Sequence, residues 1–257
     1  MRLVNIAHGD FIVLAAYLAL VITGGLGIAP LTSLLLVVPG MFVLGYLLQR
    51  YLLNRTLGQD ILPPLLVTFG LSIILQNLLL ETFSADSQKL SQGELEVASL
   101  GIGQLGVGVM PLLVFASALA IIGGLQLLFY KTALGRAFRA TSDDQQTAQL
   151  MGINNKHIFG LAMALAMAVV SIAGVFLAIR TSFDPTVGPA RLLFGFEAVI
   201  IGGLGSLWGT LAGGVILGVA QAVGAKLDPG WQILAGHLVF LLILIVRPRG
   251  LFPRSVD

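Results

Sequence analysis

Two short polar runs interrupt the apolar stretches of this sequence and could do chemistry. The first places a histidine, a glycine and an aspartate at the start of an apolar stretch, and the second places a glutamate before two adjacent glycines. Ionisable groups at membrane depth are costly and usually face a cavity, while adjacent glycines weaken a helix. We therefore expect a broken helix in each half of the chain and a translocation path lined by His8, Gly9, Asp10, Glu197, Gly202 and Gly203.

Simpler structural roles are open for some of these residues and their neighbours. Asp10 could cap the helix that follows it by accepting hydrogen bonds from free N–H groups. Gly205, Gly209 and Gly213 recur every four residues, and this spacing lets helix backbones approach closely, so we assign them to helix packing. The two polar runs lie in opposite halves of the chain, which suggests the internal repeat found in transporters.

The sequence offers little support for enzymatic chemistry. Ser206 and His237 could in principle pair for nucleophilic catalysis, but the serine lacks the G-x-S-x-G context. Three scattered histidines, no cysteine and no H-E-x-x-H run make a metal site unexpected. Gly101, Gly103 and Gly106 spell G-x-G-x-x-G without the flanking strand and helix of a dinucleotide site, and no G-x-x-x-x-G-K-[ST] run occurs. We expect no catalytic residue, no metal, no cofactor and no ATP hydrolysis by this chain.

The composition indicates that lipid surrounds these residues. Of 257 residues, 57% are hydrophobic and only 10% are charged, whereas an ordinary soluble domain carries about 25% charged residues. So little charge argues against a soluble enzyme, a disordered tail or a nucleic-acid binder, and the net charge of +2 gives no reason to expect nucleic acid as a partner. We predict an all-α fold, in which residues 1–257 form a single polytopic bundle of about eight membrane segments, some broken or partial.

Apolar stretches of roughly 20 residues mark the expected transmembrane helices, because that length spans the hydrocarbon core. A glycine-rich turn that ends at Pro30 separates the first two stretches. The stretch 192–226 must cross twice, or dip in and return, with at most about 17 residues in each arm. The clear spans are Phe11–Ala29, Leu31–Leu48, Leu62–Leu80, Pro111–Tyr130, Ile158–Ile179 and Trp231–Val246.

Charged residues predict which side of the membrane each loop occupies. Loop 131–157 carries four lysines and arginines against two aspartates, and the C-terminal tail carries three arginines. Loop 81–109 carries four acidic residues against Lys89 alone. Lysine and arginine are retained on the cytoplasmic side. We therefore expect loop 131–157 and the C-terminus inside, and loop 81–109 outside.

Loop 131–157 should contain one short helix that docks onto a cytoplasmic partner, with a solvated linker as the alternative. Ser142 followed by acidic residues and Gln145 is typical of an N-cap with a capping box, and Gly152 is typical of a helix end. The prediction is a helix from about Asp143 to Met151. The residues assigned to coupling with this partner are Ser142, Asp143, Asp144, Gln146, Thr147, Ala148 and Gly152.

Several motifs together resemble the permease subunits of bacterial high-affinity branched-chain amino acid importers, a group of the ABC superfamily with urea and amide permeases as close relatives. The general ABC permease signature E-A-A-x-x-x-G is only partly kept, because Gln146-Thr147-Ala148 and Gly152 preserve its spacing but lack the glutamate and one alanine. The resembling segments are Val4–Phe11 with Ala15–Tyr17, Gly135–Ala140, Asp184–Gly188, Gly195–Gly209 and Arg247–Phe252.

The resemblance implies a multi-pass subunit of the bacterial inner membrane that imports branched-chain amino acids by alternating access, powered by ATP. It implies a second permease subunit, as homodimer or heterodimer, two ATP-binding cassette subunits that grip residues 143–152, and a periplasmic substrate-binding protein. A urea or short-amide importer and a passive channel remain alternatives. Family members usually carry a further hydrophobic helix before the motif at His8, so we expect that helix to be missing here.

Overall fold

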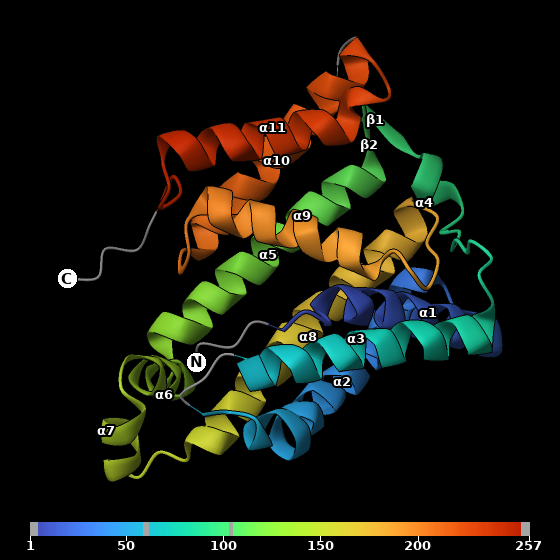
Figure 1. Ribbon diagram of the computed structural model, residues 1–257. Coiled ribbons are helices and arrows are strands. Elements are labelled where there is room, and N and C mark those ends of the chain that lie inside the picture. The colour runs from blue at the N-terminus through green and yellow to red at the C-terminus, as the bar shows by residue number, and fades with distance from the viewer. Residues whose placement is uncertain (1–4, 59–61, 103–104, 253–257) are drawn as a thin grey trace. The chain divides into compact units, whose positions relative to one another are not determined.

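A computed structural model describes residues 5–58, 62–102 and 105–252 and is almost entirely helical over these ranges (Figure 1). Six described helices are long and apolar enough to cross a membrane. They confirm the predicted all-α membrane fold, with six described helices of spanning length against the prediction of about eight membrane segments, some partial. The six are α1 (His8–Leu26), α2 (Pro30–Leu47, continued by a π-helical segment Leu48–Leu52 and a 3₁₀ turn Leu53–Arg55), α3 (Leu62–Phe83), α5 (Val109–Lys131), α8 (Asn155–Arg180) and α10 (Leu207–Leu227).

The remaining described elements are shorter. The helices are α4 (Glu94–Val97), α6 (Ala133–Asp143), α7 (Gln145–Leu150), α9 (Gly188–Gly202) and α11 (Trp231–Val246). Strands β1 (Ser99–Ile102) and β2 (Leu105–Gly108) form an antiparallel hairpin in which Gly101 pairs with Gly106. The G-x-G-x-x-G run therefore lies in a hairpin, and its middle residue Gly103 lies outside the described residues.

Helix ends follow local sequence signals. Gly27 ends α1 with φ +65°, a conformation that glycine adopts without a steric penalty. Pro30 begins α2 at the first helical position, where its missing N–H costs nothing. The predicted turn between the first two helices is thereby confirmed, and α11 has the bounds predicted from the sequence.

The chain divides into two compact units. The N-terminal unit contains residues 1–116 and 127–190, and the C-terminal unit contains 117–126 and 191–257. In the N-terminal unit, α1, α2 and α8 pack closely because small residues replace side chains at the contacts. A Cβ added at Gly174 of α8 would lie 2.8 Å from the Cβ of Ala15, and one added at Gly45 of α2 would lie 2.9 Å from the carbonyl oxygen of Met163.

The core of the N-terminal unit also contains a buried aromatic cluster. The ring of Tyr17 stacks on Phe83 at 4.4 Å between centroids and meets the edge of Phe183 at 5.0 Å. Phe183 exchanges two backbone hydrogen bonds with Gln88, at 2.8 and 2.9 Å. This cluster fixes the end of α3 and the segment after α8 around the middle of α1.

Candidate translocation and coupling sites

Asp10 lies in the first turn of α1 and is fully buried. It does not cap this helix: α1 begins at His8, and the flanking Ala7 makes no side-chain cap. The Nε2 of Gln76 on α3 instead donates to Asp10 Oδ1 at 2.9 Å and also to Ser72 Oγ at 3.1 Å. The capping hypothesis for Asp10 was therefore wrong.

Gly9 does not form the break expected in this half of the chain. It lies inside α1, which runs without interruption for 19 residues. The irregular backbone comes just before, where Asn5 Oδ1 accepts the N–H of Ala7 at 2.9 Å and Nδ1 of His8 lies 3.1 Å from the Asn5 carbonyl oxygen. The polar run thus forms a side-chain-stabilised turn at the start of a continuous helix.

One face of α3 supplies polar partners that the sequence interpretation missed. Thr68 Oγ1 accepts the N–H of Ile6 at 3.3 Å, and Ser72 and Gln76 belong to the Asp10 cluster. Residues spaced by four share one face of a helix, so the signal was present in the repeat of Thr68, Ser72 and Gln76. From its apolar composition alone, this helix had been predicted only to span the membrane.

Asp10 also touches the backbone at the start of α9. A Cβ added at Gly188 would lie 2.9 Å from both the Cα and the N of Asp10, so only glycine fits there. Asp10 Oδ2 is buried and has no hydrogen-bond partner among the described residues. The cluster therefore holds a buried carboxylate whose second oxygen has no described hydrogen-bond donor.

The second carboxylate, Glu197 of α9, pairs with a histidine of α11 in the C-terminal unit. Glu197 is 2% exposed, and its Oε1 forms a short hydrogen bond with Nδ1 of His237. The ring of Phe194 stacks on the His237 ring at 5.9 Å, with 10° between the planes. Glu197 Oε2 has no hydrogen-bond partner in the described part of the chain. The sequence interpretation had considered His237 as a partner for Ser206 and not for Glu197, and so missed this pair.

Ser206 does not join His237 in a catalytic dyad. Its Oγ accepts the N–H of Gly209 at 3.0 Å and caps α10. Because His237 contacts Glu197 instead, the catalytic pair considered from the sequence is not formed. Among the described residues, no group of three or more histidine, aspartate or glutamate side chains could hold a metal ion.

The predicted helix break after Glu197 is confirmed. α9 ends at Gly202, and Gly203 and Gly205 have φ of +98° and +88° before α10 begins at Leu207. The two arms differ from expectation, because α9 has 15 residues but α10 has 21 and is long enough to span a membrane. Gly205 lies in the turn and is not part of a packing face on α10, so this assignment was wrong.

Gly209 and Gly213 do pack, as predicted. A Cβ added at Gly213 would lie 2.9 Å from the N of Gly202 and would also clash with the carbonyl oxygen of Ala198, while one at Gly209 would meet the Gly202 carbonyl. The backbones of α9 and α10 therefore touch directly. Gly214, one position further, meets no described atom within 4 Å.

The segment expected to couple with a partner contains two helices, not one. Ser142 and Asp143 belong to the last turn of α6, and the N-cap of α7 is Asp144. Asp144 Oδ1 accepts the N–H groups of Gln146 at 2.9 Å and Thr147 at 3.2 Å. The predicted Ser142 cap was therefore wrong, whereas the predicted helix end near Gly152 is confirmed by φ +84° at that glycine.

All of the residues assigned to the partner contact are exposed except Ala148, which is buried and cannot meet a partner directly. Leu150 at 87% and Met151 at 78% exposure also project from the end of the helix, and the sequence interpretation had not assigned them. The hydroxyl of Thr147 and, to a lesser extent, the amides of Thr147 and Gln146 hold the pKa of Asp144 below its ordinary value, because they stabilise the carboxylate form.

Side chains at the start of α8 anchor α7. Asn155 Nδ2 donates to the carbonyl of Gln145 at 2.7 Å, and Asn154 caps α8 by accepting the N–H of His157 at 3.1 Å. Tyr46 Oη lies 2.7 Å from His157 Nδ1, which joins this corner to α2. A force applied to α7 would thus be transmitted to α8 and α2.

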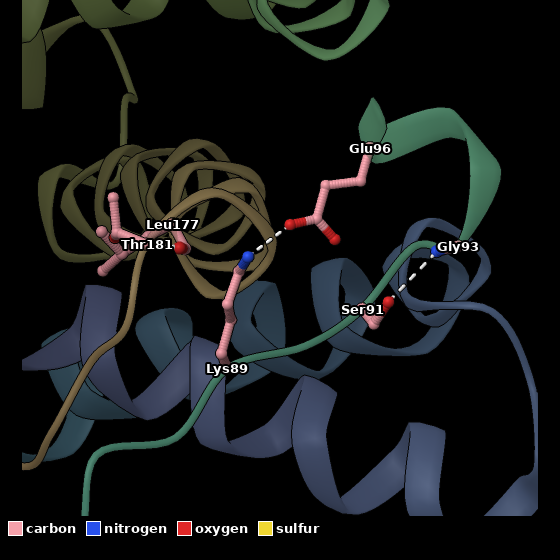
Figure 2. A network of polar contacts seen from close by, with 6 residues as sticks. All are labelled: Lys89, Ser91, Gly93, Glu96, Leu177 and Thr181. Carbon is pink, nitrogen blue, oxygen red and sulfur yellow. Dashed lines mark hydrogen bonds and ion pairs between the residues drawn. The ribbon is translucent and has the colours of Figure 1, made fainter. Parts of the chain in front are cut away.

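A backbone hydrogen bond fastens the loop 81–109 to α8. Leu90 donates to the carbonyl of Ala178 at 2.8 Å, and Ser91 Oγ accepts the N–H of Gly93 at 3.3 Å. Figure 2 shows Lys89 reaching past the end of α8 to pair with Glu96. The Lys89 hydrogen bond holds the pKa of Glu96 below its ordinary value.

Comparisons with known proteins identify relatives along nearly the whole chain. The family profile described as the permease component of the branched-chain amino acid transport system matches residues 1–247. The chain is 30% identical to BraD, a high-affinity branched-chain amino acid transport system permease protein of Pseudomonas aeruginosa, over 98% of this chain and 86% of BraD. LivH of Escherichia coli K12, described in the same words, is 27% identical over the same shares.

A second Escherichia coli permease protein of a high-affinity branched-chain amino acid transport system, LivM, is 28% identical over 48% of this chain and 29% of LivM. No solved structure matches the chain. The family match over residues 1–247, in a chain with six described membrane-length helices, shows that this protein belongs to the family of permease components of branched-chain amino acid transport systems.

Proposed function

We propose that this chain is a membrane-spanning permease subunit of an ATP-driven importer, and that it moves branched-chain amino acids across the bacterial inner membrane by alternating access. The observation that carries the proposal is the family match over residues 1–247 of a chain with six membrane-length helices. BraD and LivH are both described as branched-chain amino acid permeases, which favours this substrate class.

The two buried carboxylates are the proposed polar positions of the path. Asp10 and Glu197 each keep one buried oxygen that no described group satisfies. Leaving such an oxygen unpaired is costly, so a substrate ammonium group that reached it would be stabilised there. His8 and Gly9 flank the first carboxylate, and the turn at 202–203 follows the second. The route needs only weak affinity, because a periplasmic binding protein would supply high affinity and specificity.

The proposed contact with the ATPase subunits is α7. This helix is capped by Asp144, anchored to α8 by Asn155, and ends in the exposed Leu150 and Met151. An ATPase that closes on binding ATP would move α7 as a unit and, through α8 and α2, switch the accessible side of the path. Loop 81–109, on the opposite side, is the proposed landing surface for the binding protein.

A second permease subunit is also proposed. LivH and LivM of Escherichia coli are both described as permease proteins of a high-affinity branched-chain amino acid transport system, which supports a related permease as the partner of this chain. Co-purification of a tagged and an untagged copy of this chain distinguishes a homodimer from a heterodimer with a related permease.

The test is uptake by proteoliposomes that contain this chain, a second permease, two ATPase subunits and the binding protein. We expect ATP-dependent uptake of labelled leucine that excess unlabelled leucine abolishes and excess urea does not. Competition by urea would reassign the substrate class. Uptake that persists without ATP would contradict the importer proposal and indicate a passive channel.

A further inference from the structure

The segment after α11 folds back onto the end of α9 within the C-terminal unit. The N–H of Leu251 donates to the carbonyl of Ile201 at 2.9 Å, and the N–H of Phe252 donates to the carbonyl of Gly202 at 3.0 Å. Gly250 makes this approach possible with φ +81°, and a Cβ added there would lie 2.5 Å from the Cα and N of Gly203. A chain segment almost 50 residues away in sequence therefore closes the open end of this helix.

The carbonyl groups at the end of α9 need such donors. The last carbonyls of any helix have no partner within the helix, so they need donors from elsewhere in the chain or from water. The N–H of Gly203 serves the carbonyls of Val199 and Ile200, but the turn leaves those of Ile201 and Gly202 to the tail. The contacts use backbone groups, so they depend on the path of the tail and not on its side chains.

We propose that residues 250–252 are an intramolecular strap that closes the end of α9 and ties the α9–α10 turn to the end of α11. The strap places the turn 203–206 at the same membrane surface as the C-terminal tail and not at mid-membrane. Together with the Glu197–His237 contact it joins α9 to α11 at two points, separated by four residues of α9 or about 6 Å of helix rise. One further step rests on the proposed function: the strap keeps Glu197 in contact with His237 during transport.

The backbone nature of the contact gives a matched pair of variants. Leu251→Pro removes the N–H that serves Ile201, whereas Leu251→Ala keeps it. The chain has no cysteine, and Ile201 is fully buried, so an Ile201→Cys reporter in the full transporter measures the strap by maleimide labelling. We expect Leu251→Pro to raise the labelling rate at least tenfold and Leu251→Ala to change it less than twofold. Equal rates in the two variants would overturn the strap.

A second measurement covers the case in which Leu251→Pro fails to insert. In the unmodified transporter, we expect the amides of Leu251 and Phe252 to exchange with deuterium slowly, like those of α11. Rapid exchange of both amides would overturn the proposal even without any variant. Neither measurement depends on transport. The strap proposal can therefore be rejected while the proposed function holds, and the proposed function can be rejected while the strap holds.

The membrane position of the turn is tested separately by single cysteines at two exposed sites, Leu204→Cys in the turn and Phe252→Cys in the strap, which are 71% and 54% exposed. A membrane-impermeant maleimide should reach both from the same face of sealed vesicles. Labelling from opposite faces would contradict the placement.

The link between the strap and Glu197 is tested by transport. Leucine uptake should fall at least tenfold with Leu251→Pro at equal membrane content, and normal uptake together with fast labelling of residue 201 would disprove that link.

Discussion

At the scale of single residues, the two buried carboxylates are held by partners distant in sequence. Asp10 depends on Gln76, 66 residues away, and Glu197 depends on His237, 40 residues away. Burying a polar group is costly unless it is hydrogen-bonded. Each carboxylate therefore stabilises the packing of two helices while one of its oxygens stays without a described partner.

Removing His237 should show how strongly the protein depends on this pairing. His237→Ala leaves Glu197 buried without any described partner, and we expect a loss of about 1–3 kcal/mol in stability, the usual cost of an unsatisfied buried group. His237→Gln keeps a donor and should lose less. The measurement is the thermal unfolding midpoint of the purified subunit in detergent. Equal midpoints for the alanine and glutamine variants would show that the contact contributes little.

Glu197→Gln separates the charge from the hydrogen bond. The amide keeps an acceptor for His237 but cannot attract an ammonium group, so we expect near-normal assembly and reduced leucine uptake. The measurement is the initial uptake rate, normalised to the permease content of the membrane. Normal uptake with normal assembly would remove Glu197 from the path.

Asp144 offers a test of the proposed coupling helix. Asp144→Ala should weaken α7 and reduce substrate-stimulated ATP hydrolysis, while Asp144→Asn should preserve it because asparagine caps equally well. The pKa of Asp144 is lowered from 3.8, so the carboxylate's contribution is complete above that pH and is lost only as pH falls through the lower folded value. Titration of Asp144 should therefore not change substrate-stimulated ATP hydrolysis between pH 6 and 8. If the alanine variant hydrolysed ATP as fast as the unmodified protein under stimulation, the coupling role would be contradicted.

At the scale of elements, long spans were predictable and interfacial helices were not. Hydrophobicity and length identify a membrane helix almost unaided, and α11 has its predicted bounds. α6 was missed because its charges suggested a loop, although its buried Gly135, Phe138 and Thr141 recur every three residues along one face. The N-cap of α7 was predicted at Ser142, because Ser142 and Asp144 lie close together in the sequence and either could cap a helix. In the structure the N-cap is Asp144, and the helix buries Ala148.

Neighbouring glycines of α10 provide a matched test of helix packing. Gly213→Ala would force a methyl group into the backbone of α9, whereas Gly214→Ala adds one where no described atom lies within 4 Å. Overpacking typically costs 1–3 kcal/mol, so we expect about that loss for Gly213→Ala. Gly214→Ala should be neutral or slightly stabilising, because alanine favours a helix. The thermal unfolding midpoints of the two variants decide the matter, and similar midpoints would contradict the close α9–α10 approach.

At the scale of the whole molecule, the outward surface is that of a protein in lipid. Large apolar side chains such as Leu227, Ile245 and Leu35 are exposed on the membrane-length and shorter apolar helices. So many large exposed apolar side chains need lipid, detergent or a partner subunit to cover them. The sequence predicted this environment from composition alone, but the pairing of helices within it depended on contacts between residues far apart along the chain.

The expected orientation of the chain can be tested with two cysteines, one on each side of a single helix. Among the described residues, α5 is the one membrane-length helix between Val97 and Leu150, and its 23 residues rise about 34 Å, enough for a hydrocarbon core of about 30 Å. Val97 and Leu150 are 84% and 87% exposed, so Val97→Cys and Leu150→Cys should both react readily. Because basic residues gather around α6 and α7, an impermeant maleimide should label residue 150 from the cytoplasmic face and residue 97 from the periplasmic face. Labelling of both from one face would mean that α5 does not cross, and a reversed pattern would place α7 out of reach of any cytoplasmic ATPase.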